Sequence, residues 1–345
     1  MRVTRPESWP RRDRREPEIR DTRNRHWTRL ENTELPPASP ALAAEITEIA
    51  AGLGAAPATI SPKYFYDAEG SVLFERITRL PEYYLTRTER AIMQAHGEEI
   101  GRQVGRGATV IELGAGNCEK ARRLCALIEP GCFVAVDISA DFLHQAVDGL
   151  RAAFPALDVR AVVADLLGEL ALPDDIPADR RLVFYPGSSI GNFDPPAALA
   201  LLGRMRALLA ADGALLIGVD LVKDVAVLEA AYDDAAGVTA AFNLNVLTHL
   251  NRLLGADFDL VQWRHRALFN REKSRIEMHL EAYADTLVTW PGGSRHFRRG
   301  ERIHTENSYK YRIADFADLL ELAGFASRSC WTDPGHAFAV LLARP

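Results

Sequence analysis

The stretch that decides the fold is Ile111-Glu112-Leu113-Gly114-Ala115-Gly116-Asn117-Cys118-Glu119-Lys120. An apolar run at residues 108–113 ends at Gly114 and Gly116, and a helical pattern follows at once. This order predicts a strand, a tight turn of bare backbone and a helix, a geometry that lets a nucleoside-bearing cofactor approach closely. A dinucleotide-binding turn would carry a third glycine where Glu119 stands. Because a carboxylate there would repel a pyrophosphate, the turn favours a cofactor with a nucleoside and no phosphate.

Two acids stand at the ends of the next two apolar runs. Residues 133–136 are closed by Asp137, and residues 159–164 are followed by Asp165. The first acid is placed to accept both ribose hydroxyls of a nucleoside, and the second to accept from an adenine amino group. Taken singly, each is better explained as a helix N-cap. Together with the glycine turn, three successive strand ends predict an adenosyl site, for which S-adenosylmethionine is the obvious ligand.

Composition limits the class of protein. The chain has 345 residues, 48% of them hydrophobic, which is enough for a large core in one or two domains. No apolar run reaches about 18 residues, so no membrane span is expected, and the Arg-rich start lacks the apolar core of a secretory signal. The four cysteines have neither disulfide-motif nor metal-ligand spacing: Cys118, Cys125, Cys132 and Cys330. We expect a reduced, cytoplasmic, monomeric protein without a metal site.

Charge is divided unevenly along the chain. Residues 1–30 carry a net charge of +5, which leaves −11 on the remainder of a chain whose total is −6. This polar, proline-containing stretch predicts a disordered basic tail over residues 1–35, which could contact nucleic acid or an acidic partner but is more often merely solvated. An acidic body lacks the basic face that nucleic acid requires, so the expected substrate is a small molecule.

Buried strands alternate with helices between residues 108 and 220, which predicts a doubly wound α/β fold with a parallel sheet. The expected strands are residues 108–113, 133–137, 159–164, 181–185 and 214–219. Before them we expect helices over residues 41–53, through Leu80, and from Thr88 onward.

Residues 224–306 interrupt this alternation. A helical region over 227–254 and an extended run over 274–290 precede a helix at 313–323 and a final strand at 337–343. We therefore expect a substrate-binding lobe made of residues 36–88 and 223–310. The cofactor domain would comprise 89–222 and 311–345, with the small-molecule pocket between the two.

Two polar segments are candidates for substrate binding. Asn192 follows the fourth strand and can both accept and donate hydrogen bonds, which suits an amino acid, although Gly187 to Asn192 could also be simple loop residues. Glu306 and Ser308 alternate onto one side of an extended segment, where they could clamp both nitrogens of an imidazole or form a helix cap. Tyr232 and Met278 are core residues by default.

These motifs together closely resemble the histidine-specific N-alpha-methyltransferases of ergothioneine biosynthesis. The resemblance runs from about residue 36 to the C-terminus. It is carried by the segments Tyr64–Asp67, Ile77–Tyr84, Glu112–Lys120, Gly187–Asn192, Asp220–Asp224, Ala230–Leu247, Ile276–Met278, Glu306 with Ser308, and Trp331–Pro334.

The resemblance implies two sets of site residues. The S-adenosylmethionine site would comprise Gly114, Gly116, Lys120, Asp137, Asp165 and Leu166. The histidine site would comprise Tyr84, Gly187, Asn192, Tyr232, Met278, Glu306 and Ser308. In that scheme Asn192, Gly187 and Tyr232 bind the amine and carboxylate, Glu306 and Ser308 engage the imidazole, and Met278 lines the imidazole pocket. Departures from the family pattern are modest and remove no hydrogen-bonding side chain from the site: Ala115, Asn117, Cys118, Leu166 and Asn307.

The implied reaction is three successive methyl transfers to the α-amine of histidine, giving trimethylhistidine (hercynine). No general base can be named from the sequence. The nearest alternative is N-methylation of another aromatic amino acid, such as a tryptophan derivative; Glu306 and Met278 favour histidine, since an indole offers a single donor. An alternative from another class is a protein that binds S-adenosylmethionine or histidine without reacting.

Overall fold

The computed structural model describes residues 40–166, 168 and 170–345, so the predicted tail over residues 1–35 lies outside the described part. Its centre is a seven-stranded sheet in the order β12-β13-β6-β5-β2-β3-β4. The strands are β2 (Thr109–Leu113), β3 (Cys132–Asp137), β4 (Asp158–Val163), β5 (Arg181–Tyr185), β6 (Ala214–Asp220), β12 (Ser327–Thr332) and β13 (Phe338–Arg344). The strands β4, β3, β2, β5 and β6 are parallel, whereas β13 and β12 pair antiparallel.

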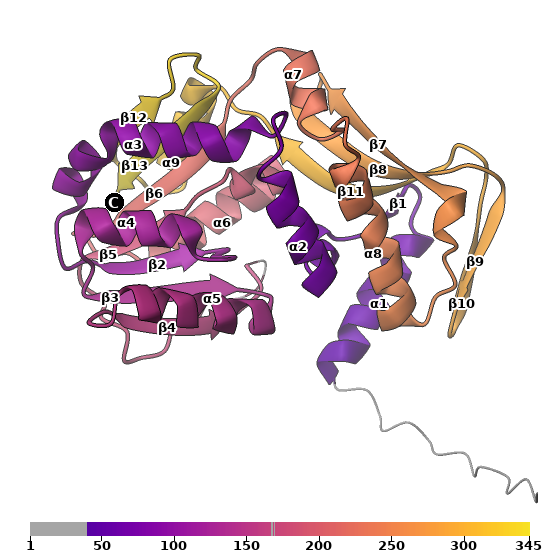
Figure 1. The fold of residues 1–345 in the computed structure, drawn as a ribbon, viewed down its shortest axis with the longest axis horizontal. Helices are drawn as coiled ribbons and strands as arrows, with labels where there is room; N and C mark the ends of the chain where they lie inside the picture. Colours follow the sequence, from indigo (N-terminus) through magenta and orange to yellow (C-terminus); the bar gives the residue numbers. More distant parts are fainter. Residues whose placement is uncertain (1–39, 167, 169) are drawn as a thin grey trace, which may run out of the picture.

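Helices cover both faces of this sheet (Figure 1). They are α3 (Tyr84–Val104), α4 (Glu119–Ile128) and α5 (Ala140–Ala153) on one face, and α6 (Pro195–Ala207) and α9 (Ile313–Leu322) on the other. Neighbouring residues of a strand point to opposite faces, so Val110 joins the apolar core under α3, α4 and α5 while Ile111 joins the core under α6 and α9. This arrangement confirms the predicted doubly wound α/β fold.

A second sheet lies beside the first (Figure 1), in the order β1-β11-β8-β7. Its strands are β1 (Ala58–Thr59), β7 (Trp263–Asn270), β8 (Arg275–Ala282) and β11 (Arg302–Tyr309), accompanied by the hairpin β9 (Thr286–Trp290) and β10 (Gly293–Phe297). Helices α1 (Pro40–Gly54), α2 (Ala68–Ile77), α7 (Val225–Ala230) and α8 (Val238–Leu254) pack around it, together with the 3₁₀ helices η1 (Pro62–Phe65) and η3 (Leu260–Gln262).

The predicted boundaries differ from the observed ones at three places. The helical region expected over 227–254 is two helices, because the Asp234 carboxylate accepts hydrogen bonds from the N–H groups of Val238 and Thr239 and starts α8 anew. The extended run expected over 274–290 divides between β8 and β9. The helix expected from Thr88 begins at Tyr84, whose side chain is buried. Within the described residues, no helix has the length and apolar character needed to cross a membrane.

Candidate functional site

The turn after β2 leaves open space beside the backbone. Gly114 and Gly116 have φ of +68° and +51°, and a Cβ atom at either would meet nothing within 4 Å. Asp137, at the end of β3, holds this turn in place: its Oδ2 accepts from the Gly116 N–H at 2.9 Å and its Oδ1 from the Ser139 N–H at 3.0 Å. The positive φ values explain why glycine is needed at both positions.

An outer chamber of about 550 Å³ opens at this turn, along the carboxyl ends of β2, β3, β4 and β5. All six residues predicted for the cofactor line it: Gly114, Gly116, Lys120, Asp137, Asp165 and Leu166. Met93 and Phe142 add apolar surface, and Lys63 lies 3.8 Å from Asp165. Open backbone, acids and apolar surface together fit an adenosyl ligand, because ribose and adenine both donate hydrogen bonds and the adenine ring is flat and apolar.

A smaller inner chamber of about 50 Å³ adjoins the outer one. Six of the seven residues predicted for the substrate line it: Gly187, Asn192, Tyr232, Met278, Glu306 and Ser308. The two chambers share Tyr66, Phe74, Tyr83, Gly187, Ser189 and Asn192 as lining residues, so they are in contact along one wall.

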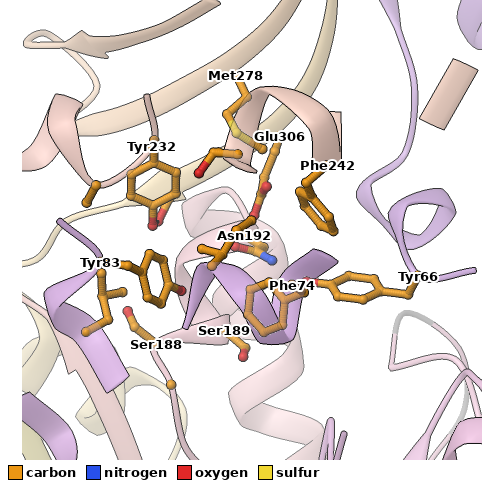
Figure 2. A pocket seen from close by; sticks show the side chains of 16 residues that line it. Tyr66, Phe74, Tyr83, Ser188, Ser189, Asn192, Tyr232, Phe242, Met278 and Glu306 are labelled. Atoms are coloured by element: carbon orange, nitrogen blue, oxygen red, sulfur yellow. The ribbon is translucent and has the colours of Figure 1, made fainter. Parts of the chain in front are cut away.

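Aromatic rings form much of the inner wall (Figure 2). Phe74 is 5.8 Å from Tyr66, 6.3 Å from Tyr83 and 6.0 Å from Phe242, measured between ring centroids, and Tyr83 is 6.3 Å from Tyr232. Tyr66 precedes α2, Phe74 lies in α2, Tyr83 precedes α3, Tyr232 precedes α8, and Phe242 lies in α8. They suit a flat ring as ligand.

Glu306 and Asn192 face each other inside this wall (Figure 2). Asn192 ends the 3₁₀ helix η2 (Ser189–Asn192), which packs on β11; at Gly191 a Cβ atom would lie 2.9 Å from the Tyr309 carbonyl oxygen, so glycine permits the approach. With its amide nitrogen toward β11, Asn192 donates to Glu306 Oε1 at 3.3 Å and to the Asn307 carbonyl at 3.2 Å.

The Glu306 carboxyl has an altered acidity. Burial raises its pKa to about 7, and the nearby positive charge of Lys310 opposes part of that rise. Around neutral pH, Glu306 can therefore either accept a hydrogen bond as a carboxylate or hold a proton.

Tyr232 and Ser308 meet in the lining of the inner chamber. The Tyr232 hydroxyl and Ser308 Oγ are 2.6 Å apart, and Lys310 Nζ donates to both, at 3.1 Å and 2.7 Å. Lys310 in turn pairs with Asp220, at 2.7 Å between Nζ and Oδ2, and both side chains are 0% exposed.

Tyr84 does not line either chamber, which corrects its predicted position in the histidine site. Its hydroxyl donates to Asp220 Oδ2 at 2.7 Å and accepts from Lys223 Nζ at 2.7 Å, so it is held one layer behind the cavity. Its neighbour Tyr83 lines both chambers. Because α3 starts at Tyr84, the side chains of Tyr83 and Tyr84 point to different sides.

Nothing in the sequence distinguishes Glu89 from Glu98 and Glu99, the other acids of α3. In the structure Glu89 is buried, accepts from the Gly187 N–H through Oε1 at 2.8 Å, and pairs through Oε2 with Lys120 Nζ at 2.6 Å. Glu89 thus links a residue of the outer chamber to the wall shared with the inner one. Phe74 and Phe242 were also not predicted for the site. Both are apolar residues of helices, and in the sequence such residues look like ordinary core residues.

Comparison with known proteins decides the family. The sequence profile described as histidine-specific, SAM-dependent methyltransferase matches residues 45–345. The chain belongs to this family. It is a methyltransferase that uses S-adenosylmethionine as methyl donor, which confirms the expectations for enzyme class and cofactor. Within the described residues, no group of three or more His, Cys, Asp or Glu side chains could hold a metal ion.

Individual relatives agree with this assignment. The histidine N-alpha-methyltransferase of Mycolicibacterium smegmatis is 42% identical over 86% of this chain and 93% of its own, and that of Mycobacterium tuberculosis is 39% identical over the same shares. Ergothioneine biosynthesis protein 1 of Neurospora crassa is 32% identical over 80% of this chain but only 32% of its own length.

Proposed function

We propose that the methyltransferase transfers three methyl groups in succession to the α-amine of L-histidine, giving hercynine for ergothioneine biosynthesis. The observation that carries the proposal is the inner chamber, which combines an acceptor, Glu306, with the Tyr232–Ser308 hydroxyls inside an aromatic wall. A neutral imidazole has one N–H donor and one lone-pair nitrogen, so it complements this pair of groups.

The shared wall supports methylation at the α-amine. Gly187 and Asn192 line both chambers, and an amine held there would face the outer chamber while the ring lies in the inner one. When bound, S-adenosylmethionine supplies a methyl group on a sulfonium, which is a good leaving group. The contribution of the chain is therefore mainly to align the amine and to exclude water.

The amine must be neutral to accept a methyl group. The α-amine at the end of a peptide has a pKa of about 8, and the adjacent carboxylate of free histidine raises it further. The substrate amine must therefore lose its proton on binding, to water or to a tyrosine, before it accepts the methyl group. Each transfer also removes one N–H, and Asn192 can turn its amide to accept or donate as the amine changes. We further propose that residues 36–88 and 223–310 act as the substrate-binding lobe and residues 89–222 and 311–345 as the cofactor domain of a cytoplasmic monomer.

A second candidate is an aromatic amino acid with an indole. The rings of Tyr66, Phe74, Tyr83 and Phe242 would also accommodate that side chain. The test is to incubate the protein with S-adenosylmethionine and each amino acid and to follow the product mass. Histidine should gain one, two and then three methyl groups. Turnover of tryptophan in preference to histidine would overturn the proposal.

Selectivity gives a second arm to this experiment. Glu306→Ala should lower turnover of histidine far more than turnover of any other amino acid that the wild type accepts. If the ratio of histidine turnover to turnover of the other amino acids is unchanged, Glu306 does not determine the selectivity for the imidazole.

A further inference from the structure

Beneath the inner chamber lies a buried charge network that no part of the methyl-transfer reaction requires. Asp220, at the end of β6, pairs with Lys310 Nζ at 2.7 Å and with Lys223 Nζ at 2.5 Å, and accepts from the Tyr84 hydroxyl. Removing such charges from water is costly, and well-packed apolar side chains of similar volume often give a protein equal stability. The network therefore invites an explanation other than stability. The network touches the chamber through Lys310, which reaches both Tyr232 and Ser308.

We propose that Lys310, held by Asp220, is a positioning residue that makes the Tyr232–Ser308 hydroxyl pair a hydrogen-bond donor toward the unprotonated ring nitrogen of the substrate. The inference rests on the proposed function, since it concerns how the same chamber reads histidine.

The argument follows from counting protons. A lysine ammonium has three N–H donors and no acceptor. Here all three have partners: Asp220 Oδ2, Ser308 Oγ and the Tyr232 hydroxyl. Both hydroxyl oxygens therefore accept from Lys310, and neither can direct its own proton at it.

The two hydroxyls have one further contact, with each other at 2.6 Å. One proton satisfies that contact, so among the described residues the other O–H has no partner and is left for the chamber that both residues line. A ligand atom that meets this pair must then be an acceptor. Glu306, which also lines the chamber, supplies the complementary acceptor for a ring N–H, so the ring form selected is the neutral imidazole with one proton and one lone pair.

Lys223 provides a matched control. It pairs with the same aspartate and also contacts the Tyr84 hydroxyl, but no hydrogen bond joins it to Tyr232 or Ser308. Removing its charge perturbs the network without removing a donor from the hydroxyl pair.

The experiment measures binding of two ligands by calorimetry in the presence of S-adenosylhomocysteine. One ligand is histidine. The other is pyrrolylalanine, as the 2-yl or the 3-yl isomer, whichever binds more tightly; each keeps one ring N–H and has carbon in place of the lone-pair nitrogen. Lys310→Met should weaken histidine by about tenfold or more, the usual effect of losing a hydrogen bond supported by a charge. Binding of pyrrolylalanine should weaken less than about threefold, because its ring has no lone pair and therefore does not accept that hydrogen bond in the wild type.

Lys223→Met should change the affinities for histidine and pyrrolylalanine by the same factor. Equal weakening of histidine and pyrrolylalanine in Lys310→Met would overturn the inference, since Lys310 would then only support the site or act on the carboxylate. If Lys310→Met does not fold, Lys310→Gln keeps a side chain of similar length without the charge, and the same unequal loss is expected. Should the wild type neither bind nor methylate histidine, it is the proposed function that fails.

Discussion

The predicted cofactor residues of the outer chamber stand at or just after the ends of consecutive parallel strands, whereas the predicted substrate residues of the inner chamber come from separate strands, loops and a 3₁₀ helix between Gly187 and Ser308. In the outer chamber, position along the strand order dictates which side chain meets the ligand. In the inner one, the strands β8 and β11, the helices α2, α3 and α8 and the 3₁₀ helix η2 each contribute one or two side chains. The first is a general device for an adenosyl group, and the second is specific to the substrate. If this division holds, substitutions in one chamber should affect one ligand.

The largest effect is expected for Asp137→Ala in the outer chamber. The change removes the hydrogen bond from the Gly116 N–H in the glycine turn and the one from the Ser139 N–H before α5, as well as the carboxylate that lines the outer chamber. We expect S-adenosylhomocysteine to bind about 100-fold more weakly, a loss of roughly 3 kcal/mol for two charge-assisted hydrogen bonds. Calorimetry measures this directly. Asp158→Ala, an exposed acid on β4, is the control, and equal affinities of the two variants would contradict the role of Asp137.

Glu306→Ala should weaken the binding of histidine and leave the binding of the cofactor product unchanged. Among the described residues, Glu306 is the one carboxylate that lines the inner chamber, so its loss removes the acceptor for the ring N–H. Histidine should bind about 30-fold more weakly, roughly 2 kcal/mol, and S-adenosylhomocysteine should bind as before. Glu272→Ala, on an exposed turn, serves as the control. A comparable loss for both ligands would break the division between the chambers.

The acidity of Glu306 also predicts how stability depends on pH. Because burial raises its pKa from 4.5 to about 7, the folded state binds this proton more tightly than the unfolded state does. The free energy of unfolding therefore falls as pH rises from about 4.5 to 7, by about 3 kcal/mol for the full shift and about 2 kcal/mol after allowing for partial solvent exposure.

Glu306→Gln removes this titration. Its stability relative to the wild type should thus be greater at pH 8 than at pH 5, and denaturant unfolding at the two values measures the difference. A relative stability that is the same at both pH values would mean that folding does not raise the pKa of the Glu306 carboxyl.

The smallest effect tests the link between the chambers. Glu89→Gln keeps an oxygen for the Gly187 N–H but loses the ion pair with Lys120. We expect S-adenosylhomocysteine to bind about fivefold more weakly, roughly 1 kcal/mol, with little change for histidine. Glu89→Ala should weaken both ligands, because the Gly187 N–H then loses its partner as well. If Glu89→Ala affects one ligand alone, the shared wall does not couple the two sites.

The contrast between the chambers also explains what the sequence could predict. Gly114, Asp137 and Asp165 follow successive apolar runs, so their meeting at one edge was predictable from strand order. Glu306 and Ser308 were recognisable because they alternate along one strand. Lys310, Asp220 and Glu89 could not be found, because each gains its partners only when segments distant in the chain pack together. Tyr84 was implied for the histidine site by the family resemblance alone, whereas its neighbour Tyr83 is the residue that lines both chambers.

The proposed reaction is tested most directly by the position of the transferred methyl groups. The protein is incubated with histidine and S-adenosylmethionine carrying a ¹³C methyl group, and the product is analysed by heteronuclear NMR. We expect all label on the α-nitrogen, ending as three equivalent methyl groups, and none on the imidazole. Label on a ring nitrogen would contradict the placement of the ring in the inner chamber and the amine at the shared wall.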